Sequence, residues 1–380
     1  MTMLPDFRLE TYLAKWEFAA RYHMTASDME SMSMAELLAL ATDEDRAEFD
    51  RLRLGYIETS GTPQLREAIA GTYAGIAAAD VLAFAGAEEG IFCAMHALLD
   101  KDSHAVVVTP NYQSSESLPV SICAATGVAL RESENWALDV DELHSALRPY
   151  TRLVLINFPH NPSGKVIDRA TFDAVVRLCR DRGIYLFSDE VYRGLERRPE
   201  LQLPQAAEVY ERGLSLNVMS KAYGLPGLRV GWIACKDRDL LARMERMKHY
   251  LSICNAGPSE HLAVIGLKAR QRIVARNLAL IERNLVEVNA FFAEFPDLFD
   301  WREPDGGCIG FPRYKGKDGV ETFCRRLAEE IGVVLLPAGI YQSALTPTPA
   351  DRFRIGFGRS YVPEGLAAMR AWLRGNRRAA

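Results

Sequence analysis

Short apolar runs alternate with segments of helical periodicity between Val81 and Cys235, and this alternation constrains the fold more than any other feature of the chain. The expected strands lie at 104–109, 152–157, 184–188, 214–219 and 230–235, with helices between them, for example over 171–182. Strands that alternate with helices form a mostly parallel sheet whose two faces are both covered by helices. The sequence therefore predicts an α/β fold.

Helical periodicity also marks segments outside this region. It predicts one helix over 30–49, a second that starts within 61–70, and a long one from about 259 to 295. The apolar segments at 308–311 and 353–357 then predict a smaller α+β unit near the end of the chain.

Length, charge and cysteine usage narrow the class of protein. The 380 residues are enough for two domains and a large core. The net charge is −5 without a long run of one sign, which argues against nucleic acid as the main partner. Seven cysteines are scattered singly without a Cys-x-x-Cys pair, so we expect neither disulfides nor a metal site, and a reducing, cytoplasmic setting. No stretch approaches the roughly 20 apolar residues that span a bilayer, and we expect no membrane partner.

Polar residues appear where several apolar runs stop. Asn161 follows the run 153–156, Asp189 follows 184–187, and Lys221 follows 214–219. Ligands of α/β folds bind at the carboxyl ends of the strands. A buried lysine there has a lowered pKa, and its neutral amine can form a Schiff base. Singly, these residues could be a turn, a helix cap and a surface lysine, but their ordered occurrence favours a binding site.

Two patterns carry a family resemblance. They are Ser-Lys-x-x-Gly-x-x-Gly-x-Arg over 220–229 and Asn-Pro-x-Gly over 161–164. With them, from about Tyr56 to Arg354, the chain resembles the fold type I pyridoxal 5′-phosphate (PLP) enzymes, specifically the class I/II aminotransferase family. The resemblance implies an aspartate-aminotransferase-like fold and PLP as the cofactor.

The resemblance also implies a domain organisation and a partner. An N-terminal arm at 1–44 would join the small domain, 45–284 would form the large PLP-binding domain, and 285–380 would form the small C-terminal domain. The protein would be a homodimer with shared active sites, because Tyr56 matches a tyrosine that reaches the phosphate of the neighbouring subunit.

The family pattern assigns the catalytic roles. Lys221 would form the internal aldimine and then move the substrate's α-proton. Asp189 would keep the pyridine nitrogen protonated. Asn161 and Tyr192 would donate to the phenolic oxygen of the cofactor, and Tyr112 would stack on its ring, although Tyr112 could also be a core tyrosine.

A second group matches the phosphate site of the family. Its members are Gly86, Ala87, Glu88, Ser220 and Arg229. The amides at the start of a helix bind anions without special side chains, so Glu88 could equally be a first-turn residue that complements the helix dipole. Position 218 is usually serine or threonine in the family, and Val218 lacks that hydroxyl.

The substrate side of the site is less well defined. Arg354 and Asn161 match residues that hold the α-carboxylate, and Arg354 is a forked donor suited to a bidentate pair. Arg352 and Arg359 are rival candidates, but Arg352 is expected to be solvated or paired.

The N-terminal arm departs from the family pattern. Many relatives carry a Gly-x-Pro turn where the substrate side chain docks, whereas this chain has Thr25-Ala26-Ser27-Asp28. Asp28 and Glu17 would suit a basic or guanidino amino acid, although Asp28 could instead cap the following helix. The acidic arm is similar to that of relatives such as capreomycidine synthase, which eliminate and cyclise β-hydroxyarginine.

Three functions follow from these features. The first is transfer of an amino group from an amino acid to a 2-oxo acid through aldimine and quinonoid intermediates. The second is β/γ-elimination or cyclisation of a hydroxyarginine-like amino acid, which begins with the same quinonoid. The third, a non-catalytic regulator, is disfavoured because no basic helix-turn-helix segment precedes Tyr56.

Overall fold

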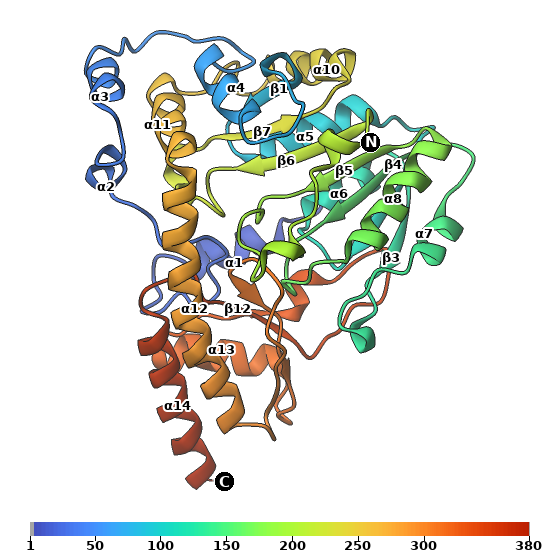
Figure 1. Cartoon of the computed structure of the whole chain (residues 1–380). Helices are drawn as coiled ribbons and strands as arrows, with labels where there is room; N and C mark the ends of the chain where they lie inside the picture. Colours follow the sequence, from blue (N-terminus) through green and yellow to red (C-terminus); the bar gives the residue numbers. More distant parts are fainter. Residues whose placement is uncertain (1–3, 380) are drawn as a thin grey trace.

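A seven-stranded sheet lies at the centre of the upper part of the molecule (Figure 1). The computed structural model describes residues 4–379, so Met1–Met3 and Ala380, the ends of the predicted arm and C-terminal domain, lie outside the described residues. The strands are β1 (Val81–Phe84), β2 (His104–Thr109), β3 (Ala124–Ala129), β4 (Thr151–Asn157), β5 (Tyr185–Asp189), β6 (Gly213–Val218) and β7 (Gly231–Ala234). Their order is β1-β7-β6-β5-β4-β2-β3, and β7 runs antiparallel to both of its neighbours. The predicted mostly parallel sheet is therefore confirmed.

Helices cover both faces of this sheet. They are α4 (Pro63–Ala70), α5 (Ala87–Leu98), α6 (Ser114–Ile122), α7 (Val140–Ala146), α8 (Arg169–Arg182), α9 (Ala206–Val209), α10 (Arg238–Lys248) and α11 (Gly257–Lys268). Alternate residues of β4 enter different hydrophobic clusters: Leu153 and Leu155 join one, and Val154 and Ile156 join the other. A strand that is buried on both sides reads as a continuous apolar run, which is why these strands were visible in the sequence.

A smaller unit lies at the lower end of the long helix α12 (Arg270–Glu294), as Figure 1 shows. It contains α13 (Val320–Ile331), α14 (Val362–Ala379), and the short strands β8 (Phe299–Asp300), β9 (Ile309–Gly310), β10 (Arg313–Tyr314), β11 (Leu336–Pro337) and β12 (Phe353–Gly356). Strands β11, β12 and β9 form an antiparallel sheet in that order, which confirms the expected α+β character. Short 3₁₀ turns lie at Ala78–Asp80, Glu132–Glu134, Pro199–Leu201, Pro226–Leu228 and Ala338–Tyr341.

Two helix predictions need correction. The helix predicted over 30–49 is two short helices, α2 (Met34–Leu38) and α3 (Asp43–Asp50), because Thr42 and Asp45 form a capping box that starts a new helix. The long pattern over 259–295 is likewise divided, because α11 and α12 are separated at Ala269.

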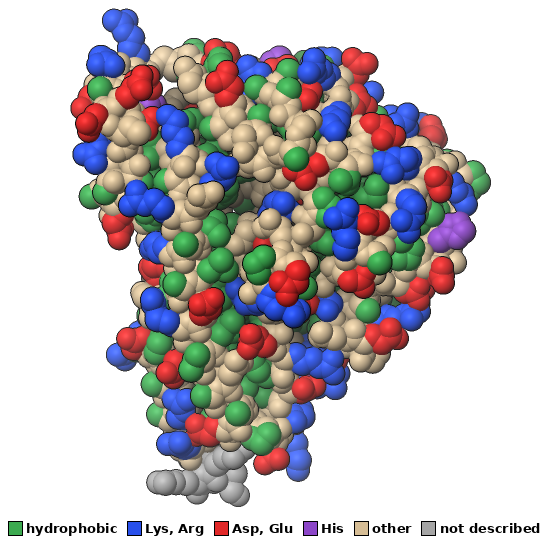
Figure 2. All heavy atoms as spheres, in the orientation of Figure 1, with side chains coloured by type: hydrophobic (Ala, Val, Ile, Leu, Met, Phe, Trp, Pro, Cys, Tyr) green, Lys and Arg blue, Asp and Glu red, His purple; other side chains and the backbone are tan. Residues whose placement is uncertain are grey.

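The remaining N-terminal helix, α1 (Arg8–Trp16), lies between the two parts of the molecule in Figure 1. Lys/Arg and Asp/Glu side chains are interspersed over the face shown in Figure 2, in keeping with the small net charge. Within residues 4–379, none of the helices combines the length and apolar character needed to cross a membrane.

The arm that follows α1 is held against β12. Gly356 N donates to Met24 O at 2.7 Å, and Glu30 N donates to Gly358 O at 2.7 Å. A Cβ atom at Gly356 would lie 2.0 Å from Ala26 O, so only glycine allows the arm to approach this closely. The arm is therefore fixed by backbone bonds to the end of β12, the central strand of the smaller sheet.

We expect Gly356→Ala to lower the free energy of unfolding by about 1–3 kcal/mol, because its methyl group overlaps the backbone of the arm. Urea unfolding followed by circular dichroism measures this change. The matched control is Gly375→Ala in α14, where no atom lies within 4 Å of the added Cβ. That substitution should instead stabilise the protein by up to about 1 kcal/mol, since alanine favours the helix. Equal effects of the two substitutions would contradict the close approach.

Candidate active site

A cavity of about 390 Å³ lies at the carboxyl ends of β4, β5 and β6, beside the start of α5. Helix α1 and the arm form its other walls. Among the residues predicted for the site, its lining contains Glu17, Asp28, Ala87, Glu88, Tyr112, Asn161, Asp189, Tyr192, Ser220, Lys221, Arg229 and Arg354. The folding of the sheet thus brings nearly all of the predicted residues together. The lining also contains residues that were not predicted for the site, among them Glu10, His23, Ser27, Asn157 and Val191.

Lys221 follows β6 and points into the cavity. Its Nζ donates a hydrogen bond of 2.9 Å to Ser27 Oγ in the arm. Burial lowers the pKa of Lys221, and the positive charge of Arg354 lowers it further, whereas Asp28 and Asp189 raise it. The lowered pKa increases the share of neutral amine, which is the form that acts as a nucleophile.

Asp189 ends β5 and lies opposite Asn157 of β4 in the register of the sheet. The side chain is only 5% exposed, and Oδ1 accepts a hydrogen bond from Val191 N at 3.2 Å. Burial raises the pKa of Asp189 to about 6 against the opposing effects of this bond and of Lys221. A buried carboxylate of this kind is stabilised by a cationic or protonated partner from a ligand.

Arg354 lies on β12 and is held from two sides. On one side it donates to Thr25 Oγ1 at 3.2 Å and Thr25 O at 2.9 Å. On the other it donates to the hydroxyl of Tyr341 at 2.7 Å and to Asn161 Oδ1 at 3.3 Å. Tyr341, which also donates to Asn161 Oδ1 at 2.9 Å, was not predicted from the sequence. The guanidinium is thus fixed at the cavity wall.

Two tyrosines complete the inner wall. Tyr192 is 1% exposed, and its buried hydroxyl makes no hydrogen bond of normal geometry within the described structure, although Ser27 lies close enough to lower its pKa. Burial raises the pKa of Tyr192 well above its usual value, so the group is a donor. Tyr112 lines the cavity and packs against Phe7, with ring centroids 5.5 Å apart. An unpartnered buried donor beside a cavity indicates a ligand acceptor at this place.

The start of α5 and Arg229 form a cradle at the other end of the cavity. Gly86 caps the helix with φ +93°, and a Cβ atom there would lie 2.5 Å from Arg229 Nη2. The free amides of the first turn of α5 and the guanidinium thus lie together, an arrangement that binds phosphate. Ser220 is buried nearby, whereas Val218 presents only methyl groups to the cavity.

The two glutamates that follow Ala87 differ in their surroundings. Glu88 lines the cavity and accepts a bond of 2.9 Å from Ser114 Oγ, and burial raises its pKa to about 7. Glu89 points away from the cavity and accepts bonds from Ala85 N at 2.6 Å and Ser252 N at 3.1 Å. Glu88 is therefore more than a first-turn residue that complements the helix dipole.

The arm brings acidic groups to the mouth of the cavity. Asp28 forms an ion pair of 2.7 Å with Arg359. Arg359, the other candidate for holding the α-carboxylate, is therefore already paired. The alternative interpretation of Asp28 as a helix cap is wrong, because α2 is capped by Ser33. Partial burial and the negative charges of Asp28 and Glu10 raise the pKa of Glu17. Negative charge thus accumulates where a substrate side chain would enter.

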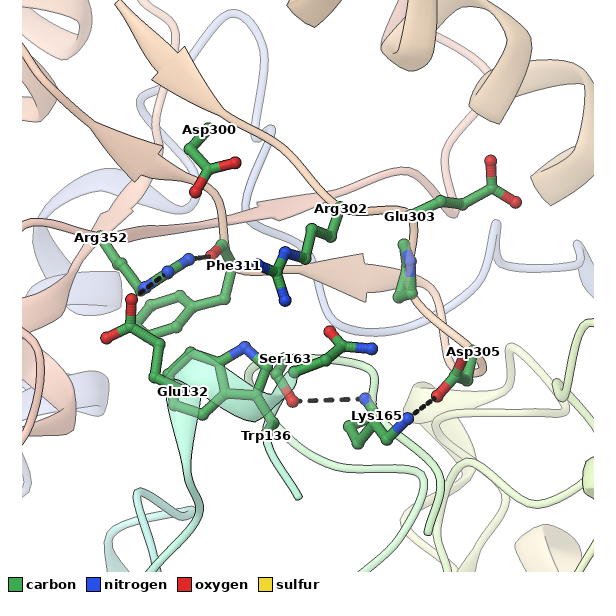
Figure 3. Close-up of a pocket in the computed structure, with 12 residues that line it drawn as sticks. Glu132, Trp136, Ser163, Lys165, Asp300, Arg302, Glu303, Asp305, Phe311 and Arg352 are labelled. Atoms are coloured by element: carbon green, nitrogen blue, oxygen red, sulfur yellow. Dashed lines mark hydrogen bonds and ion pairs between the residues drawn. The ribbon is translucent and has the colours of Figure 1, made fainter. Parts of the chain in front are cut away.

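Arg352 lies in a different, small pocket, shown in Figure 3. It forms an ion pair with Glu132 and donates to Phe311 O at 2.6 Å. The same pocket contains the ion pair between Lys165 and Asp305 at 2.9 Å. The expectation that Arg352 is paired is confirmed, and its charge is neutralised away from the cavity.

Tyr56 does not line the cavity of its own chain. Its side chain is 90% exposed and lies on the segment between α3 and α4. The prediction that it serves the neighbouring subunit remains a prediction.

The donors and acceptors of the cavity fit PLP. The cradle of Gly86 and Arg229 fits a phosphate, the buried carboxylate of Asp189 fits a protonated ring nitrogen, and the unpartnered hydroxyl of Tyr192 fits a phenolic oxygen. Lys221 supplies the amine that attaches the aldehyde of the cofactor.

Comparisons with known proteins agree with this fit. The family model for aminotransferase class I and II matches residues 25–362. Capreomycidine synthase from Streptomyces vinaceus is 31% identical over 375 residues, which cover 96% of this chain and 93% of that protein. The crystal structure of a PLP-dependent aminotransferase from Streptococcus suis superposes with a TM-score of 0.91 at 28% identity and covers 98% of both chains. The PLP-dependent cyclase OrfR gives a TM-score of 0.89 at 25% identity and covers 99% of both chains.

The chain belongs to the class I and II aminotransferase family of fold type I enzymes, and it depends on PLP. The expected family, fold class and cofactor are thereby confirmed. The individual roles of the site residues stay predictions.

The raised pKa of Asp189 leads to a prediction for the cofactor-free protein. The folded state binds this proton more tightly than the unfolded chain, whose Asp pKa is near 4. Stability is therefore lost as the pH rises from about 4 through about 6. Asp189→Asn removes this loss, so we expect the variant to exceed the wild type by up to about 3 kcal/mol at pH 7.5 and by little at pH 4. Urea unfolding at both pH values measures the difference.

The exposed residue Asp297 provides the control, since Asp297→Asn should leave stability unchanged at both pH values. If the difference in stability between the wild type and Asp189→Asn were the same at pH 4 and pH 7.5, the raised pKa of Asp189 would be contradicted.

Proposed function

We propose that this enzyme transfers the amino group of a basic or guanidino amino acid to a 2-oxo acid, with PLP as the cofactor. The observation that carries the proposal is the single cavity in which Lys221, Asp189 and Arg354 face acidic groups of the arm. Family membership supports the reaction class, and the arm supports the substrate class.

Each part of the cavity has a role in holding the cofactor. Lys221 would hold it covalently through Nζ, and Asp189 would keep its ring nitrogen protonated. Asn161 and Tyr192 would donate to the phenolic oxygen, and Tyr112 would cover the ring. The phosphate would be held by Gly86, Ala87, Glu88, Ser220 and Arg229. Gly86 and Ala87 would donate backbone amides, and Glu88, which accepts from Ser114, would lie at the edge of this group.

When bound, PLP supplies an electron sink that makes the α-hydrogen of the amino acid acidic. Lys221 Nζ would take that proton and return it, since a lowered pKa makes the neutral amine, which acts as the base, more accessible. Arg354 would bind the α-carboxylate as a bidentate donor. Its bonds to Thr25 fix the guanidinium, so the carboxylate has one defined position next to Asn161.

The substrate class follows from the charges of the arm. Glu17 is close enough to Asp28 and Glu10 for their negative charges to raise its pKa. A cationic side chain between Glu17 and Asp28 would relieve this repulsion, because opposite charges favour the ionised carboxylate. Asp28 is the less exposed of the two carboxylates, so water screens a cation beside it less, even though Arg359 shares its charge.

We therefore expect Asp28→Asn to raise the KM for L-arginine about tenfold. Loss of this partly buried charge should cost about 1.4 kcal/mol of binding free energy, which corresponds to a factor of ten. Glu17→Gln should raise it only two- to fivefold, because Glu17 is exposed and exposed pairs contribute about 0.5–1 kcal/mol. The KM for L-citrulline, whose ureido group is neutral, should change little. Steady-state kinetics with both amino acids measure these values.

Glu48→Gln in α3 provides a control for the loss of an exposed carboxylate far from the cavity, and both KM values should stay at the wild-type level. An equal rise for arginine and citrulline in Asp28→Asn would show that the arm positions the cavity wall without selecting charge.

A second candidate function has specific support. Similarity to capreomycidine synthase extends over 96% of the chain, and OrfR, a PLP-dependent cyclase, has the same fold throughout. The enzyme could therefore eliminate the hydroxyl group of a hydroxyarginine-like amino acid and close a ring. The acidic arm serves both candidates, since both need a bound guanidinium.

One product analysis separates the two functions. The purified enzyme is given L-arginine with pyruvate, or β-hydroxyarginine alone, and the products are identified by mass spectrometry. Amino transfer yields the 2-oxo acid of arginine and alanine, whereas cyclisation yields a product lighter than β-hydroxyarginine by one water. Reaction of neither substrate, with turnover of apolar or acidic amino acids, would overturn the proposed substrate class.

We further infer that the enzyme is a homodimer. The segment 54–59 lies beside the segment 248–257, because Lys248 Nζ donates to Thr59 O at 2.7 Å. The large exposed apolar side chains of these segments are Leu54, Tyr56, Tyr250, Leu251 and Ile253. Apolar residues gathered on a surface in this way usually mark an interface, and a second copy with Tyr56 at its phosphate site fits the family pattern.

Mixing two defective variants tests this inference. A dimer of one Lys221→Ala subunit and one Tyr56→Phe subunit contains one site with both native residues. We expect the mixed sample to exceed the mean activity of its two parents after subunit exchange. Light scattering provides the independent check, and a monomer at working concentration would refute the shared site.

We also infer a cytoplasmic location and the domain boundaries 1–44, 45–284 and 285–380. The seven cysteines are all free thiols, which supports a reducing compartment. The path of α12 from the large sheet to the smaller unit supports a boundary within this helix (Figure 1).

A further inference from the structure

The arm supplies a hydroxyl group to the amine of the predicted attachment lysine. Ser27 Oγ accepts a hydrogen bond of 2.9 Å from Lys221 Nζ, although 194 residues separate the two in sequence. Ser27 belongs to the Thr25–Asp28 stretch that stands in place of the Gly-x-Pro turn. We propose that Ser27 is a positioning residue that holds the free ε-amino group of Lys221 whenever the lysine is not attached to the cofactor.

The place of Ser27 is imposed by the backbone on both of its sides. Before it, Thr25 O accepts from Arg354 Nη2 at 2.9 Å. After it, Glu30 N donates to Gly358 O at 2.7 Å, and Glu30 O accepts from Arg276 Nη1 at 3.0 Å. Ser27 is therefore carried to Lys221 by a fixed segment, and the lysine, which has the longer side chain, adapts to it.

The backbone of the arm also packs tightly against neighbouring segments near Ser27. A Cβ atom at Gly358 would lie 2.7 Å from Asp28 O, and one at Gly224, which has φ +64°, would lie 2.9 Å from Glu30 O. The chain around Ser27 is thus packed between the loop after Lys221 and the end of β12. Little freedom remains for the hydroxyl to move away from Nζ.

A hydroxyl group suits an amine that must both take and release a proton. It accepts a hydrogen bond from the neutral amine and a stronger one from the ammonium form. It adds no charge of its own, so it does not trap the proton as a contacting carboxylate would. One N–H held by Ser27 also restricts the rotation of the amine.

Charged and titratable groups face Lys221 from several elements. They are Asp28 and Glu17 from the arm and α1, Asp189 from β5, Arg354 from β12 and Cys308 before β9. Asp28, Cys308 and Asp189 favour the ammonium form, whereas burial and Arg354 favour the neutral amine. Ser27 adds a short-range bond to this long-range balance, so its removal should lower the pKa of Lys221.

The inference rests on the proposed role of Lys221, and one experiment tests the two separately. The full chain is loaded with pyridoxamine 5′-phosphate, which has an amine in place of the aldehyde and so leaves Lys221 free. Cyanate then carbamoylates the neutral amine, and mass spectrometry of the Lys221 peptide gives the rate at each pH. We expect Ser27→Ala to lower the pKa of Lys221 by about one unit, which is a tenfold change in the ratio of neutral to protonated amine.

Two further variants make the result specific. Ser27→Thr keeps the hydroxyl group and should keep the wild-type pKa. Ser31→Ala removes a serine hydroxyl from the same arm without touching Lys221 and should also leave the pKa unchanged. Absorbance of the bound cofactor verifies that each variant is loaded. A Lys221 pKa in Ser27→Ala equal to that of the wild type would overturn the proposal.

The same labelling identifies a failure of the underlying function. In the wild type loaded with PLP, attachment should protect Lys221 from cyanate, and the pyridoxamine 5′-phosphate form should not. Equal labelling of both forms would show that another residue attaches the cofactor, whatever the effect of Ser27.

Discussion

The geometry of the cavity depends on one buried asparagine at the end of β4. Asn157 Nδ2 donates to Asp189 O at 2.9 Å, and its Oδ1 accepts from Asn161 N at 2.8 Å. A single side chain thus joins the end of β5 to the loop that carries Asn161. Asp189 O also accepts from Phe158 N at 3.2 Å, so two donors from the end of β4 and its following loop bind this carbonyl. These bonds fix the position of Asn161 relative to Asp189.

The same cavity shows how a charged site is kept inside an apolar fold. Lys221, Asp189 and Glu88 are all shifted by burial toward their neutral forms. Arg354 and Arg359 are held instead by direct contacts with Tyr341 and Asp28. Lys221, Asp189 and Glu88 thus lack a close ionic partner in the described structure, whereas the charge of Arg359 is matched by Asp28.

The sequence alone predicts those parts of the protein that a pattern of neighbouring residues marks. The central strands are doubly buried apolar runs, and Lys221 and Asp189 follow such runs directly, so both could be predicted. Strand β3 was not predicted, because Ala124–Ala129 consists mainly of small residues at a half-exposed sheet edge. Ser27 and Tyr341 were also missed. Ser27 contacts Lys221 across 194 residues of sequence, and Tyr341 lies in a 3₁₀ turn 13 residues before Arg354. No periodic pattern in the sequence marks either residue.

The backbone bonds between the arm and β12 have a consequence for selectivity. Met24 and Glu30 are bonded to residues 356 and 358, and Arg354 lies on the same strand. The guanidinium at one end and the acidic arm at the other therefore belong to one rigid body. On the proposed function, the two ends would bind the α-carboxylate and the side-chain cation of the substrate at a fixed separation. A homologue one methylene shorter or longer would then contact one end but not both, so the enzyme would select substrates by chain length.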